Sequence, residues 1–136
     1  MTEQEPPRKE LLGHGGSDDL ASVRASEVDG VLVVAIAGEV DIANIDGVAE
    51  VIYAQPNSDN GLVIDLTEVS YLDSSAVSLL HDLAMRLRGR AQRLVVVSPQ
   101  GTPPRRILEL TALHTNAAVT DLLAEAIRLL GDSALP

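Results

Sequence analysis

Three short runs of apolar, mostly β-branched residues constrain the fold of this chain more than any other feature. They are VLVVAIA at 31–37, GLVIDL at 61–66 and RLVVVS at 93–98. Such continuous runs are typical of central strands that are covered on both faces. After the first two runs, apolar residues recur at helical spacing, over 44–55 (a pattern that begins with Ile42) and over 74–89. Strands that alternate with helices predict an α/β domain with a largely parallel sheet and right-handed crossovers.

Weaker signals complete the expected fold. Residues 20–28 alternate weakly and predict an edge strand, joined to 31–37 by the hairpin turn Asp29-Gly30. Residues 103–110 and 121–130 predict two further helices, and 117–120 either a short strand or an extended entry to the last helix. We therefore expect a single-domain, mixed but mostly parallel β-sheet of four to five strands with about four helices.

The chain ends differ in composition from the middle. Residues 1–18 are rich in proline, glycine and charge, which predicts a flexible N-terminal tail. The folded domain is expected over 19–131, followed by a short C-terminal tail at 132–136. Its open edge strand permits pairing, and we expect a monomer or a weak dimer.

Charge and composition exclude several classes of function. The chain has 10 basic and 20 acidic residues, a formal charge of −10, and no Phe or Trp, so neither a phosphate-binding surface nor a base-stacking platform for nucleic acid is expected. It has no cysteine, no apolar signal segment in MTEQEPPRKE, and no apolar run of the ~18 residues that a membrane span needs. We expect a soluble, cytoplasmic protein without a cofactor.

The candidate site lies where the predicted strands end. Partner and ligand sites of such sheets gather at the carboxyl ends of the strands. We expect the loops after Ala37, Leu66 and Ser98 to meet there. The second loop ends in Asp73-Ser74-Ser75, where Asp73 or Ser74 is expected to cap the next helix. Ser75 would then lie in the first helical turn, where the helix dipole tolerates a phosphate.

Two segments resemble a known family. GLVIDLTEVSYLDSSAVSLL resembles the central signature of STAS domains, and in particular of bacterial anti-sigma-factor antagonists. AIAGEVDIANIDGV resembles an earlier motif of that family, whose aspartate matches Asp41. The resemblance covers roughly residues 20–130. The serine that the partner kinase phosphorylates in that family matches Ser75, with Ser74 as the alternative acceptor. One departure is Ala76, which stands where the family usually has glycine.

The resemblance implies partner switching. The unphosphorylated protein would bind an ATP-binding anti-sigma factor that is also a serine kinase, and so free a sigma factor for transcription, as in bacterial stress responses. Phosphorylation of Ser75 would release the partner, and a separate phosphatase would reset the switch. The resemblance and the expected geometry together suggest these partner-binding residues: Asp41, Asp73, Ser74, Ser75, Ala76 and Ser78.

Two other functions stay open. The first is a STAS subunit of a transport complex or stress-sensing assembly, in which Ser75 is a contact that is never phosphorylated. The second is an enzyme that uses Asp41 and Asp73 as paired carboxylates, but no catalytic set is visible and the chain's single lysine, Lys9, lies in the tail. The three histidines are not at metal-ligand spacing, so no metal site is expected.

Three further residues receive structural interpretations. Arg105 and Arg106 are interpreted as a solvated basic pair at a helix start. Asp65 is expected to face a polar edge or to cap a neighbouring loop.

Overall fold

The computed structural model describes residues 21–56 and 60–133. The predicted N-terminal tail at 1–18 lies outside the described residues, as do the last three residues of the chain. The elements, in chain order, are β1 (Ala21–Val28), β2 (Val31–Val40), α1 (Ile45–Tyr53), β3 (Gly61–Leu72), α2 (Ser74–Arg88), β4 (Arg93–Val97), α3 (Pro103–Leu110), the 3-10 helix η2 (Leu113–Thr115), β5 (Ala118–Thr120) and α4 (Leu123–Ser133).

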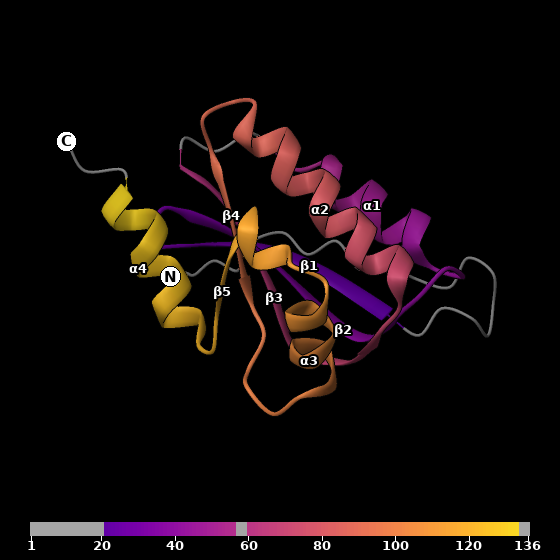
Figure 1. Ribbon diagram of the computed structural model, residues 1–136. Helices are drawn as coiled ribbons and strands as arrows, with labels where there is room; N and C mark the ends of the chain where they lie inside the picture. Colours follow the sequence, from indigo (N-terminus) through magenta and orange to yellow (C-terminus); the bar gives the residue numbers. More distant parts are fainter. Residues whose placement is uncertain (1–20, 57–59, 134–136) are drawn as a thin grey trace, which may run out of the picture.

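The strands form one sheet in the order β1-β2-β3-β4-β5 (Figure 1). β1 is antiparallel to β2, and each of the other neighbouring pairs is parallel. The hairpin turn lies at Asp29 and Gly30, whose φ values of 52° and 79° both fall in the left-handed region that a two-residue hairpin requires. The mixed, mostly parallel sheet predicted from the sequence is confirmed.

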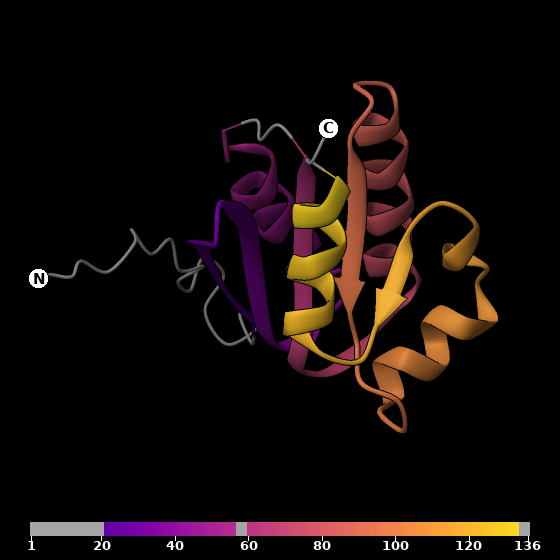
Figure 2. The same cartoon turned by 90° about the vertical axis from the view of Figure 1, so that its left-hand side faces the viewer.

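Helices cover both faces of the sheet. The larger core joins the strands to α1, α2 and α3, and the smaller core joins the other face to α4. Figure 2 shows α4 in front of the strands and α2 behind them. The centres of β3 and β4 are buried on both sides, and Val63, Ile64, Val95 and Val96 are all 0% exposed. This explains why their sequences are apolar without alternation.

β2 and β3 run further than the sequence predicted. The expected strand ends at Ala37 and Leu66 were wrong, since β2 continues to Val40 and β3 to Leu72. The two strands stay paired through register shifts between Ala35 and Ala37 and between Gly38 and Glu39. Such irregularities break the period-2 pattern by which a strand is recognised. The extension leaves Asp73 as the single residue between β3 and α2.

The interpretation of Arg105 as solvated was also wrong. Its side chain is only 14% exposed, and Nη1 donates to the Ser98 carbonyl at 2.7 Å and to Asp121 Oδ1 at 2.9 Å. Nε also pairs with Glu109 at 3.1 Å. Arg105 therefore ties α3 to the ends of β4 and β5, whereas Arg106 is exposed.

The first prediction concerns Gly61. A Cβ atom there would lie 2.0 Å from the Arg93 carbonyl oxygen, and its φ of +135° strains any other residue. We expect Gly61→Ala to lower the free energy of unfolding by ~2 kcal/mol or more. The matched control is Gly131→Ala in α4, where nothing lies within 4 Å of the added Cβ. We expect this change to be neutral or to stabilise by up to ~1 kcal/mol. Urea denaturation measures both, and equal effects would contradict the prediction.

Candidate functional site

Asp73 caps the N-terminus of α2. Its backbone is extended, with φ −108° and ψ −172°, and its Oδ1 accepts hydrogen bonds from the Ser75 and Ala76 amides at 2.9 and 3.3 Å. An aspartate in this position satisfies amides that have no partner within the helix. Of the two residues proposed from the sequence as the cap, the structure selects Asp73 rather than Ser74.

The second carboxylate oxygen of Asp73 reaches a distant part of the chain. Oδ2 accepts a hydrogen bond from the Ile42 amide at 3.0 Å, and the Asp73 amide donates to the Val40 carbonyl at 3.1 Å. Asp73 therefore joins the start of α2 to the connection between β2 and α1, at one end of the sheet (Figure 1).

Hydrogen bonds between residues that are close in the sequence hold that connection in place. Asp41 Oδ1 accepts from the Ala43 amide at 3.0 Å, and Asn44 Oδ1 accepts from the Asp41 amide at 3.1 Å. Asn44, which is 6% exposed, also donates through Nδ2 to the Glu39 carbonyl at 2.9 Å. Asp41 thus shapes the loop that Asp73 holds, which brings the two predicted aspartates to one place.

Ser75 lies in the first turn of α2 and is half-buried. Its Oγ is 2.6 Å from Asp73 Oδ1. Because an ionised carboxylate only accepts hydrogen bonds, the Ser75 hydroxyl is the donor. Ser74 and Ser78 are both exposed on the same helix. The structure thus gives Ser75 an anionic hydrogen-bond partner, whereas the other two hydroxyls have none among the residues that the structure describes.

Asp73 stays ionised to lower pH than an ordinary carboxyl group. Partial burial by itself raises its pKa, but the hydrogen bonds from the Ser75 hydroxyl and from the Ala76, Ile42 and Ser75 amides outweigh this effect, and the net pKa is lowered. The same four donors that fix the geometry therefore stabilise the negative charge.

Two exposed apolar side chains flank this centre. Ile42, whose amide binds Asp73, is 74% exposed, and Tyr71, at the end of β3, is 48% exposed. Ile42 was predicted to begin a pattern of helical spacing, and Tyr71 was not predicted as part of the site. Ile42 instead precedes the helix, in the loop that Asp73 holds. Large apolar groups beside polar ones are typical of protein-binding surfaces.

The remaining candidates lie elsewhere or point inward. Ala76 is 3% exposed and belongs to the larger core, so its methyl group turns away from the surface. The loop after Ser98 lies at the carboxyl end of the parallel strands, as predicted, and there its Gln100 amide binds Asp121, which follows β5. Asp65 accepts hydrogen bonds from Thr67, as a local cap does. Within 21–56 and 60–133, no three acidic or histidine side chains gather as metal ligands do.

Comparison with known proteins identifies the family of this chain. Residues 22–126 match the STAS domain family, and the chain belongs to that family. An anti-sigma factor antagonist from Mycobacterium paratuberculosis has 26% identity and a TM-score of 0.70, with 89% of this chain and 100% of that chain covered.

Two other structures share the fold. SpoIIAA, an anti-sigma factor antagonist in its unphosphorylated form, has 21% identity, a TM-score of 0.63 and coverage of 80% of this chain and 96% of its own. An RsbS variant from Moorella thermoacetica has 20% identity, a TM-score of 0.65 and coverage of 82% and 97%. No curated protein matches this sequence significantly. No helix among the described residues is long and apolar enough to cross a membrane.

The second prediction tests the cap. Asp73→Ala removes the acceptor for the α2 amides and for the Ile42 amide, and we expect it to lower the free energy of unfolding by about 1–2 kcal/mol. Asp46→Ala is the control, because Asp46 is an exposed acidic residue in the first turn of α1. We expect that change to cost about 0.5 kcal/mol or less. Denaturant titration at neutral pH measures the free energy of unfolding of both variants. An equally large loss of stability in Asp46→Ala would contradict the role of Asp73 as the cap of α2.

The third prediction follows from the lowered pKa of Asp73. A carboxyl group whose pKa is lower in the folded state stabilises the fold at pH values above its unfolded-state pKa, which is about 3.9 for aspartate. This stabilisation is lost as the pH falls through the folded-state pKa. The stability difference between the wild type and Asp73→Ala should therefore be largest above about pH 4 and shrink below it. Denaturation curves between neutral and acid pH test this, and a difference that grows with acid would contradict the sign.

Proposed function

We propose that this chain is an anti-sigma-factor antagonist that binds an anti-sigma kinase of the ATP-binding type and is released when Ser75 is phosphorylated. The observation that carries the proposal is the half-buried Ser75 hydroxyl, held 2.6 Å from the capping carboxylate of Asp73 in the first turn of α2. Membership of the STAS family and the 26% identity with an anti-sigma factor antagonist over 89% of the chain support it.

The arrangement around Ser75 suits a phosphorylation switch. Transfer from ATP forms an Oγ–phosphorus bond, breaks the bond between the γ-phosphorus and ADP, and releases the hydroxyl proton. The product carries about −1.5 to −2 charges where a neutral hydroxyl had been. The dipole and the first amides of α2 tolerate an anion there, so the helix survives the change. The phosphate nevertheless lies against the Asp73 carboxylate, so the local charge becomes strongly negative.

The same surface supplies the contacts that a partner needs. Ile42 and Tyr71 provide exposed apolar area at the end of the sheet where Asp73 lies, and Asp73 holds the Ile42 amide of the β2–α1 connection in place. A partner that packs on this surface removes water from it, and a buried phosphoserine beside a carboxylate then costs far more than an exposed one. Phosphorylation would therefore weaken the complex without unfolding the domain, and a phosphatase would restore binding.

The fourth prediction tests the switch. Ser75→Glu places a permanent negative charge beside Asp73, and we expect binding to the kinase to weaken more than about a hundredfold, which corresponds to ~3 kcal/mol. Ser75→Ala should still bind and should accept no phosphate at this position. The control is Ser22→Glu, because Ser22 is exposed on β1 and faces away from the layer that contains α2. It adds the same charge and should bind like the wild type.

Affinity capture from the native host with each variant, followed by mass spectrometry, reads out the result. Recovery of an ATP-binding kinase with the wild type, Ser75→Ala and Ser22→Glu, but not with Ser75→Glu, supports the proposal. Recovery of the same partners with all four proteins contradicts the switch and favours a STAS subunit of a larger assembly. Phosphopeptide analysis after incubation with the kinase and ATP distinguishes Ser75 from Ser74 as the acceptor.

A further inference from the structure

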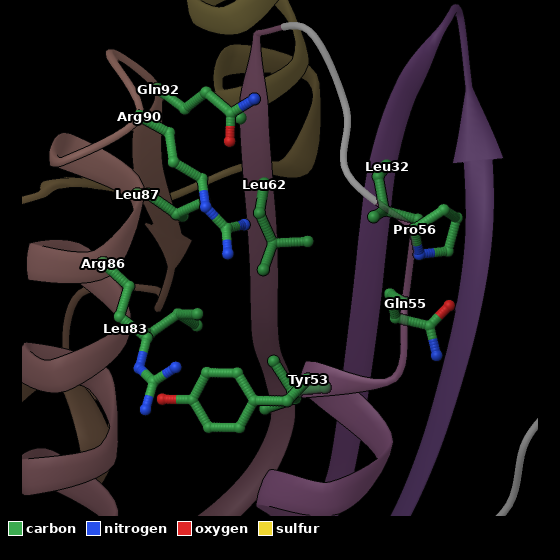
Figure 3. Close-up of a pocket in the computed structure, with 12 residues that line it drawn as sticks. Leu32, Tyr53, Gln55, Pro56, Leu62, Leu83, Arg86, Leu87, Arg90 and Gln92 are labelled. Carbon is green, nitrogen blue, oxygen red and sulfur yellow. The ribbon is translucent and has the colours of Figure 1, made fainter.

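A cavity of about 160 Å³ opens at the end of the domain opposite Ser75. It lies between the C-terminal parts of α1 and α2 and the first residues of β2 and β3 (Figure 3). Strand starts and the last turns of helices meet there, whereas Ser75 follows the end of β3. From Ser75 to Arg86, α2 advances about 16 Å at ~1.5 Å per residue, so the cavity and the candidate switch do not overlap.

The inner wall of the cavity is apolar. Ile52, Leu62, Leu83 and Leu87 line it and are between 3% and 7% exposed. Leu32, at the start of β2, continues this wall toward the surface. Such a wall favours an apolar group over water, because water would find few hydrogen-bond partners on it.

The rim of the cavity is polar and cationic. Arg86, on α2, and Arg90, in the turn after it, extend toward Tyr53 and Leu62 (Figure 3). Arg86 is held in place, because its guanidinium lies 4.6 Å from the centre of the Tyr53 ring and its Nε pairs with Asp82 Oδ2 at 3.3 Å. The Tyr53 hydroxyl donates to the same Asp82 oxygen at 2.8 Å.

Arg86 keeps donors available after these contacts. Its Nε uses Asp82, and its two terminal nitrogens have no hydrogen-bond partner among the described residues. A guanidinium presents those nitrogens as a planar pair that matches a carboxylate or a phosphate. Arg90 adds a second positive charge at the rim of a chain whose formal charge is −10.

The volume limits the size of the ligand. Pockets for drug-sized molecules hold roughly 300–1,000 Å³. A dry apolar cavity of about 150 Å³ engineered in another protein accepts one benzene ring. The cavity at α1 and α2 therefore has room for a single ring or a short branched alkyl group and for nothing much larger.

We propose that this cavity binds a small amphipathic anion, with an aromatic ring or short alkyl group on the leucine wall and a carboxylate or phosphate on the terminal nitrogens of Arg86. The apolar wall, the volume and the fixed guanidinium each select one part of such a molecule. The site is independent of the kinase-binding surface, since it lies at the other end of α2.

Benzoate and phenyl phosphate are the probes, titrated into the full-length protein labelled with ¹⁵N and followed by amide chemical shifts. We expect saturable shifts at Leu62, Leu83 and Tyr53, with a dissociation constant in the millimolar range or below. Benzyl alcohol has the ring without the charge, and acetate and inorganic phosphate have the charge without the ring. Each of these should bind at least about tenfold more weakly.

Matched variants locate the anion. Arg86→Gln removes the charge from an exposed position and should weaken benzoate binding about tenfold or more. Arg88→Gln is the control, because Arg88 lies on the same helix but donates to Asn116 instead. Filling the cavity by Leu32→Phe should also abolish binding while the protein stays folded.

Several outcomes would overturn the inference. One is the absence of saturable shifts, and another is equal affinity for benzoate and benzyl alcohol. Equal losses in Arg86→Gln and Arg88→Gln would show a general charge effect instead of a site. Shifts confined to the region of Asp73 would place the ligand elsewhere. None of these results bears on whether Ser75→Glu releases the kinase, so the two proposals fail separately.

Discussion

The organisation of the site depends on the hydrogen bonds that the Asp73 carboxylate accepts. One oxygen receives the first amides of α2 and the Ser75 hydroxyl, and the other receives the Ile42 amide. A helix start and a loop from a different part of the chain are thereby held at a fixed spacing by a single charged group. Its lowered pKa shows that the surrounding donors favour the ionised form over the neutral one.

This dependence means that the phosphorylation of Ser75 that we propose would have a local consequence. The hydroxyl is one of the donors that stabilise the Asp73 charge, and a phosphate at the same atom is an anion that opposes it. The site thus changes from a satisfied carboxylate to two adjacent negative groups. The helix N-terminus stabilises one anion, the Asp73 carboxylate, and the phosphate would have to be stabilised by solvent or by a partner. A partner surface that fits the unphosphorylated state would therefore not fit the phosphorylated one.

The sequence was sufficient to predict the central sheet, because β-branched runs such as 31–37 and 93–98 have few alternatives once helices flank them. It was also sufficient to predict a cap at Asp73 or Ser74, since an aspartate before two serines at a helix start has a local physical role, and the structure selects Asp73. Both predictions depend on residues that are neighbours in the chain. The local pattern carried no sign of the β3 extension over 67–72, where register shifts disrupt the alternation of apolar residues.

Contacts between distant residues were beyond such reasoning. The Asp73–Ile42 hydrogen bond spans 31 residues and the Arg105–Asp121 pair spans 16. The sequence placed Ile42 in a pattern of helical spacing. In the structure it precedes α1, its amide binds Asp73 and its side chain is exposed to solvent. Arg105 looked like a surface charge because its acceptors, a strand-end carbonyl and an aspartate in another loop, have no sequence pattern of their own.

The two ends of α2 have opposite electrostatic character, and this follows from the helix itself. Its first turn has free amides that favour an anion, and the sequence places Asp73 and the Ser75 hydroxyl there. Its last turn is the negative end of the helix dipole, which favours cations, and the sequence places Arg86 and Arg88 there, followed by Arg90. At the first end the favoured anion belongs to the chain and a phosphate adds to it. At the second end the cations belong to the chain, and Arg86 pairs with Asp82 through Nε, so its two terminal nitrogens suit the external anion that we propose. The two sites that we propose therefore lie at opposite ends of one helix of 15 residues, each in the place where the helix dipole supports its chemistry.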